Sequence, residues 1–95
     1  MLKIKNLITE VEYEAIQYKE YNTEQVNNIK EFITENLDLC VRVIMPNLHI
    51  FNLEQYDYES VIKPTDYIIR TITDGIPLYN VVSKEIMESN FKIMA

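Results

Sequence analysis

Two short segments of the chain combine residue types that could bind a charged partner. In the first, Glu10, Glu12 and Glu14 fall on one side of an extended chain, about 7 Å apart. This spacing resembles that of phosphates along a nucleic-acid strand, so it favours contact with a basic protein surface. The alternative interpretation is an ordinary solvated strand face. Nothing nearby would raise the pKa of one carboxyl selectively, so we do not expect a catalytic pair here.

The second segment alternates aromatic and acidic residues over Tyr56, Asp57, Tyr58 and Glu59. Tyrosine supplies rigid contact area and carboxylates supply charge, a combination that protein interfaces favour. The alternative is an edge strand whose tyrosines pack on their neighbours. We predict that this segment is the main binding site and that the glutamate stripe is a second patch.

Residues that usually carry catalysis are scarce. His49 is the single histidine, and no serine or cysteine partner is recognisable from its spacing, so a structural role is favoured. Cys40 lies in an apolar run and is expected to be a buried, inert thiol. With one glycine, the chain has no phosphate-binding loop, and it has no Cys/His set for a metal. We therefore expect a protein that is not an enzyme and that uses no cofactor.

Length and charge restrict the class of protein further. The 95 residues suit a single domain over 1–95, and 47% hydrophobic with 11% aromatic residues is a globular composition. The formal net charge of −6 has the wrong sign for binding nucleic acid or an anionic membrane directly. Residues 1–60 carry this negative charge, because acids and bases balance over 61–95. We expect neither a signal peptide nor a membrane span, since no apolar run is long enough.

The first half of the chain reads as a strand followed by a helix. Apolar and polar residues alternate over 7–18, which predicts a half-buried strand. Asn22 with Gln25 three positions later predicts a helix start, and the helix is expected over about 23–37. Its predicted buried stripe is Val26, Ile29, Ile33 and Leu37, with Phe32 beside it.

The second half reads mostly as strands. Residues 39–45 and 48–53 form a predicted hairpin, and residues 66–72 and 76–82 form another across Asp74-Gly75. The stretch 54–60 is expected to be a loop or an edge. Ser83 should cap a short helical turn that runs to Asn90, before a closing strand or docking tail over 91–94. The fold class is therefore α+β: a mainly antiparallel sheet or small curled barrel packed with one amphipathic helix, plus a short C-terminal helical turn.

Both ends of the chain resemble a family of small bacteriophage and prophage proteins. The first block is Val11-Glu12-Tyr13-Glu14-Ala15-Ile16-Gln17-Tyr18, similar to the family's opening strand V-x-x-E-A-x-Q-Y, followed by a capped helix. The second is Lys63-Pro64-Thr65-Asp66-Tyr67-Ile68-Ile69, then Ile76-Pro77-Leu78-Tyr79 and Ser83-Lys84-Glu85-Ile86-Met87, similar to the family's closing block P-G-D-Y-I-I…Y-P-C-x-x-D-I-F. Thr65 replaces a family glycine, and the cysteine after the proline is missing. The resemblance implies a phage accessory protein acting in the bacterial host cytoplasm, and it transfers no functional residues.

Three functions follow as hypotheses. The leading one is an acidic protein that binds a basic surface of a host protein and inhibits a defence or regulatory component, in the manner of an anti-CRISPR or DNA mimic. The second is an oligomeric sponge or reader of a small nucleotide signal, which would need a pocket built from Arg42, Lys63, Arg70 and Lys84. The third is a minor virion or assembly protein. Each of the three hypotheses is compatible with a homo-oligomer.

Overall fold

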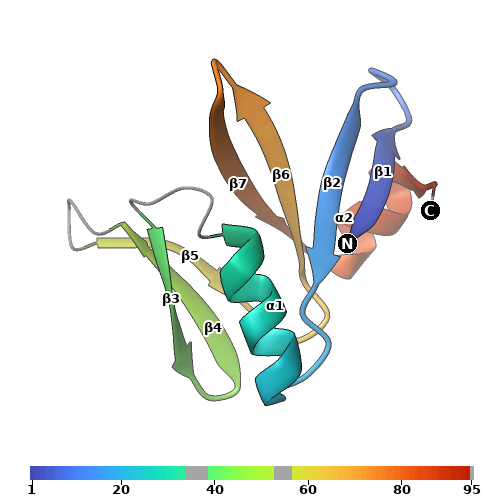
Figure 1. Cartoon of the computed structure of the whole chain (residues 1–95). Coiled ribbons are helices and arrows are strands. Elements are labelled where there is room, and N and C mark those ends of the chain that lie inside the picture. The colour runs from blue at the N-terminus through green and yellow to red at the C-terminus, as the bar shows by residue number, and fades with distance from the viewer. Residues whose placement is uncertain (34–38, 53–56, 95) are drawn as a thin grey trace.

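The computed structural model describes residues 1–33, 39–52 and 57–94, which form two antiparallel sheets and two helices (Figure 1). The larger sheet has the strand order β7-β6-β2-β1-β8. Its strands are β1 (Leu2–Asn6), β2 (Glu12–Gln17), β6 (Tyr67–Thr73), β7 (Ile76–Val82) and β8 (Phe91–Ile93). The fold class is therefore α+β as predicted, but the sheets do not close, so the curled barrel is wrong.

The smaller sheet lies beside α1 (Figure 1). It consists of β3 (Leu39–Ile44), β4 (Asn47–Asn52) and β5 (Asp57–Ile62), in that order. The β3–β4 hairpin confirms the prediction. β5 was expected to be a loop or an edge: it is an edge strand, and the loop alternative is wrong for residues 57–60.

Helix α1 (Thr23–Ile33) begins where the sequence predicts. The Gln25 N–H donates to Asn22 Oδ1 at 2.8 Å, which satisfies one of the free amides of the first turn. The Gln25 side chain does not return to Asn22 as in a capping box; its Oε1 accepts from the Lys19 and Glu20 amides. Val26, Ile29, Phe32 and Ile33 are buried as predicted, whereas Leu37 lies outside the described residues.

Two cores lie on opposite faces of the larger sheet. The larger core joins α1, the smaller sheet and β6, and contains Tyr18, Val26, Ile29, Phe32, Ile33, Leu48, Ile50, Ile62 and Ile68. The smaller core lies under α2 (Lys84–Asn90) and contains Ile4, Ala15, Tyr67, Ile69 and Met87. Successive side chains of a strand point to opposite faces, so Ile68 serves one core and Ile69 the other.

Local caps and turns agree with the sequence in the C-terminal half. Ser83 Oγ accepts the Ile86 N–H at 3.2 Å and caps α2. Asp74 and Gly75 both have positive φ, 53° and 78°, as a two-residue hairpin turn requires. Pro77 lies on the edge strand β7, where a missing N–H does not interrupt the sheet. β8 is the predicted closing strand and pairs with β1.

Tyr18 ties the larger core to the β3–β4 turn. It is completely buried, and its hydroxyl donates to the Pro46 carbonyl at 2.8 Å. Burial raises the pKa of the Tyr18 hydroxyl above the ordinary value of 10.0, and the neighbouring Tyr21 raises it further. The neutral hydroxyl is therefore the form that the folded chain favours.

Candidate functional site

The larger sheet is held together at its centre by one short ladder. β2 and β6 pair from Gln17 opposite Tyr67 to Glu14 opposite Arg70. Beyond this point the hairpins β1–β2 and β6–β7 separate toward their tips (Figure 1). Glu14 and Arg70 therefore mark the apex of an opening between two hairpins.

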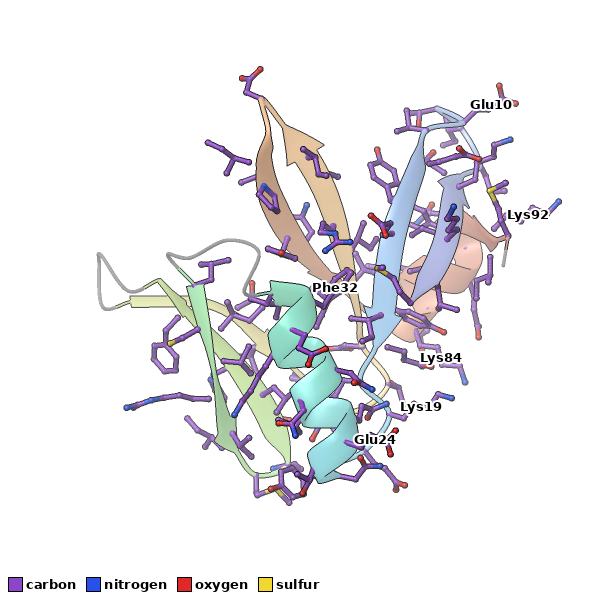
Figure 2. The ribbon with its side chains drawn as sticks, viewed as in Figure 1. Glu10, Lys19, Glu24, Phe32, Lys84 and Lys92 are labelled. Atoms are coloured by element: carbon purple, nitrogen blue, oxygen red, sulfur yellow. The ribbon has the colours of Figure 1, made fainter. Side chains whose placement is uncertain are left out.

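Arg70 is the buried charge of this apex. Its residue is 7% exposed, and its Nη2 lies 2.9 Å from Glu14 Oε1. Its guanidinium carbon lies 4.5 Å from the centre of the Phe32 ring, and its Nη2 donates to Met1 Sδ at 3.3 Å. Figure 2 shows Phe32 at the end of α1, next to the larger sheet. The pair and the ring contact thus join α1 to β2 and β6.

Tyr79 strengthens the same junction from β7. Its hydroxyl donates to the Phe32 carbonyl at 2.6 Å, and the two rings meet edge to face at 5.7 Å. The carbonyls of a last helical turn lack partners within the helix, so this bond satisfies one of them. Glu14, Phe32, Arg70 and Tyr79 are far apart in the chain, so no local pattern in the sequence predicts that they form a cluster.

Two grooves meet at Arg70. One, of about 430 Å³, lies between α1 and β2 and is lined by Ile16, Asn28, Glu31 and Phe32 among others. The other, of about 560 Å³, is the notch between the diverging hairpins. The notch is lined from both faces of the sheet, by Glu12 and Ile72 on one face and by Tyr13 and Thr71 on the other. It therefore lies where β2 and β6 are no longer paired.

The predicted stripe of three glutamates is broken by the fold. Glu10 lies in the β1–β2 turn with φ 60°, and Figure 2 shows it at the hairpin tip. The predicted strand over 7–18 is wrong at this end because Asn6 Oδ1 accepts the Ile8 and Thr9 amides and starts a turn. β1, which the sequence pattern did not reveal, supplies the other arm of this hairpin.

The remaining two glutamates of the stripe face positive charges. In the β1–β2 register Glu12 lies opposite Lys5, and Glu14 lies opposite Lys3 while also pairing with Arg70. Directly opposite side chains in a sheet are about 5 Å apart at Cβ. The stripe is therefore locally balanced and makes a weaker acidic patch than the sequence suggested.

The tyrosine segment lies at one end of the smaller sheet. Tyr56 falls outside the described residues, and the structure describes the backbone of Asp57, Tyr58 and Glu59 at the start of β5. Asp57 pairs with Asn52, and Asn52 pairs with Leu39. The chain therefore enters β3, leaves β4 and enters β5 at the same end of the sheet.

Most of the excess charge belongs to two segments of the sequence, one that precedes β3 and one that follows β4 and includes the first residues of β5. Residues 34–38 and 53–59 contain no lysine or arginine, and they hold Glu35, Asp38, Glu54, Asp57 and Glu59. These are five of the six excess negative charges of the chain. The remainder of the sequence is nearly neutral.

His49 and Cys40 belong to the face of the smaller sheet that points away from α1. His49 is half-buried on β4 and stacks on Phe51, with ring centres 6.4 Å apart. Cys40 is half-buried on β3, opposite Phe51, and forms no disulfide. The thiol is thus less buried than predicted. Among the described residues no group of three or more His, Cys, Asp or Glu side chains could hold a metal ion.

The four cations proposed for a nucleotide pocket lie on separate elements. Arg70 is on β6 and pairs with Glu14, whereas Arg42 is exposed on β3, 5.6 Å from the centre of the Phe51 ring. Lys63 follows β5, and Lys84 begins α2. The two grooves that meet at Arg70 are lined by none of the other three.

The chain matches no protein-family model, no curated protein and no solved structure. In the part of the chain that the structure describes, neither helix has the length and apolar character needed to cross a membrane.

Proposed function

We propose that this chain is a small acidic phage-encoded accessory protein that binds a basic surface of a host protein and inhibits a bacterial defence or regulatory component. The observation that carries the proposal is the placement of charge. Five of six excess negative charges belong to residues 34–38, which precede β3 in the chain, and to residues 53–59, which follow β4 and also contain Tyr56 and Tyr58. The resemblance to phage proteins supports the setting in the host cytoplasm.

Charge and aromatic residues have separate roles in such a contact. A concentrated negative charge steers a basic partner and raises the association rate, and salt screens this effect beyond about 8 Å at physiological ionic strength. Aromatic residues at the centre of an interface supply the lasting contact. A host protein that binds nucleic acid has a basic surface, which is complementary to an acidic segment that also carries aromatic residues.

The test is capture from bacterial lysate at low and high salt. We expect the tagged chain to retain a host protein at low salt and to lose most of it at high salt. Replacing Tyr56, Asp57, Tyr58 and Glu59 by serine should abolish retention. The matched control replaces Tyr21, Glu85 and Glu88, which removes one exposed tyrosine and two exposed carboxylates elsewhere, and should retain the partner. The identified partner's activity should then fall when the chain is added.

Single substitutions separate the two proposed patches. Tyr58→Ala should weaken binding by about 30-fold, which corresponds to about 2 kcal/mol for an aromatic anchor. Glu12→Ala should change mainly the association rate, because Glu12 already faces Lys5. Equal losses from both would argue against an anchor in the smaller sheet.

A thermal-shift panel of cyclic nucleotides run beside the capture distinguishes the other hypothesis. A ligand that binds the native state alone raises the melting temperature. A clear shift with one nucleotide, combined with no captured protein, would replace the inhibitor by a nucleotide reader. Capture of a virion component alone would indicate an assembly protein.

A further inference from the structure

The notch between the diverging hairpins exposes strand edges inside the larger sheet. The Tyr18 N–H donates to the Asp66 carbonyl, so the backbone N–H and C=O groups of even-numbered residues of β2 point toward β6. The Asn6 N–H donates to the Val11 carbonyl, so odd-numbered residues face β1. Alternation along the strands then directs the N–H and C=O of Glu12 and of Ile72 into the notch.

These backbone groups lie beyond the end of the ladder. The described β2–β6 pairs stop at Glu14 opposite Arg70, whereas β6 continues for three more residues beside β7. An open strand edge is a template for pairing with another strand. The notch therefore offers one donor and one acceptor on each wall to an extended backbone.

The two hairpins also carry much of the exposed apolar surface of the molecule. Six large apolar residues on them are between 46% and 85% exposed: Leu7, Ile8 and Val11 on β1–β2, and Ile72, Ile76 and Leu78 on β6–β7. Apolar side chains gathered around a groove usually mark an interaction site. Val11 and Ile72 line the notch, so part of this apolar surface borders the open strand edges, and the other four residues lie on the same two hairpins.

The charges of this region are nearly balanced. Lys3, Lys5 and Arg70 face Glu12 and Glu14 within the sheet, and Glu10 and Asp74 lie at the two tips. Five of the six excess negative charges belong to residues 34–38 and 53–59, which are not part of these hairpins. Two copies can therefore meet through the hairpins without the like-charge repulsion that their net charge of −6 would otherwise impose.

We propose that a second copy of this chain docks on the hairpins β1–β2 and β6–β7, so that strand edges and apolar tips of the two copies cover one another across a twofold axis. A twofold dimer is the commonest soluble oligomer. At about 100 Å² per aliphatic side chain, the six residues offer roughly 350 Å² of apolar surface per copy. Homodimer interfaces are about 65% apolar, so this apolar surface corresponds to a total buried area of roughly 1,100 Å² over both copies. An interface of this area is enough for a reversible dimer.

The first test is sedimentation velocity of the full chain from about 5 to 500 µM. We expect the weight-average mass to rise with concentration from 11.3 kDa toward twice that value. A mass that stays at 11.3 kDa over the whole range overturns the proposal.

A comparison of two double variants locates the interface. The double variant Ile72→Lys with Ile76→Lys puts two lysines at exposed positions of the β6–β7 tip and should weaken self-association at least tenfold. The matched control is Ile44→Lys with Met45→Lys, which makes the same change of charge at exposed positions of the β3–β4 tip and should leave it unchanged. Equal weakening by both pairs would move the interface away from the hairpins.

Amide hydrogen exchange provides a test that needs no variant. The amides of Glu12 and Ile72 should exchange more slowly at 500 µM than at 5 µM, because a second copy covers them. The amide of Val61, an exposed residue of β5, should exchange equally at both concentrations. Unchanged exchange at Glu12 and Ile72 in a chain that does dimerise would also overturn the proposal.

Discussion

Removing Glu14 should destabilise the protein more than removing Arg70, although the two residues form one ion pair. The Arg70 side chain is 6% exposed and the Glu14 side chain is 37% exposed. Glu14→Ala therefore removes the carboxylate that lies 2.9 Å from a buried guanidinium. Arg70→Met leaves a carboxylate that water reaches, and it replaces the buried cation by an apolar chain of similar length.

The magnitude follows from this difference in exposure. Losing one member of a fully buried pair costs about 3–5 kcal/mol, whereas exposed pairs contribute about 0–1 kcal/mol. Because Glu14 is more than one-third exposed, we expect about 2–3 kcal/mol for Glu14→Ala. We expect about 1 kcal/mol or less for Arg70→Met. For a domain of this size these values correspond to melting temperatures lowered by about 10–20 °C and by less than about 8 °C.

Urea unfolding followed by far-ultraviolet circular dichroism measures both variants and the double variant. The double variant should be about as stable as Arg70→Met, because the buried cation is absent from both. Glu12→Ala is the control, since Glu12 is exposed on the same strand. A loss below about 1 kcal/mol for Glu14→Ala, or a larger loss for Arg70→Met, would refute the reasoning.

Three further substitutions test the packing, the buried hydroxyl and the hairpin turn. Ile33→Asp places a charge in the larger core and should cost more than about 4 kcal/mol in a thermal melt, whereas Asn27→Asp on the exposed side of α1 should cost less than about 0.5. Tyr18→Phe should cost about 1 kcal/mol at pH 8, because the bond to Pro46 is lost. Since the folded chain raises the pKa of Tyr18, wild-type stability should fall as the pH rises above about 10, and urea titrations should show a smaller fall in Tyr18→Phe. Gly75→Ala should lower the free energy of unfolding by about 1 kcal/mol. The cause is the positive φ of 78° and not a steric clash, because a Cβ at this position meets nothing within 4 Å. An unchanged melting temperature would contradict this.

Local patterns in the sequence were sufficient for α1, α2 and both long hairpins. Asn22 and Ser83 cap the helices through bonds to residues three positions away, and Asp74-Gly75 turns the chain through backbone conformations of its own. Each signal acts within a few residues, so it can be read without knowing the fold. The α+β class followed from the order of these elements.

The sequence did not reveal β1, and it predicted β5 only as one of two alternatives, for the same physical reason. β1 has five residues and is held by β2 and β8, and β5 is held by β4 through a register shift between Ile50 and Phe51. Their strand conformation depends on partners elsewhere in the chain. The turn at Asn6 was missed as well, which shortened the predicted strand and removed Glu10 from it.

The sequence by itself determined the charge, the acidic and tyrosine-rich segments and the faces of each helix, because these depend on residue type and short spacing. Only the tertiary structure decided which charges neutralise one another. Glu14 and Arg70 are far apart in the chain, and they meet because β2 and β6 pair in one register. The same pairing ends at this point and opens the notch, since the hairpins that flank it diverge. Short spacings in the sequence reveal neither this register nor the divergence, because both depend on contacts between residues that are far apart in the chain.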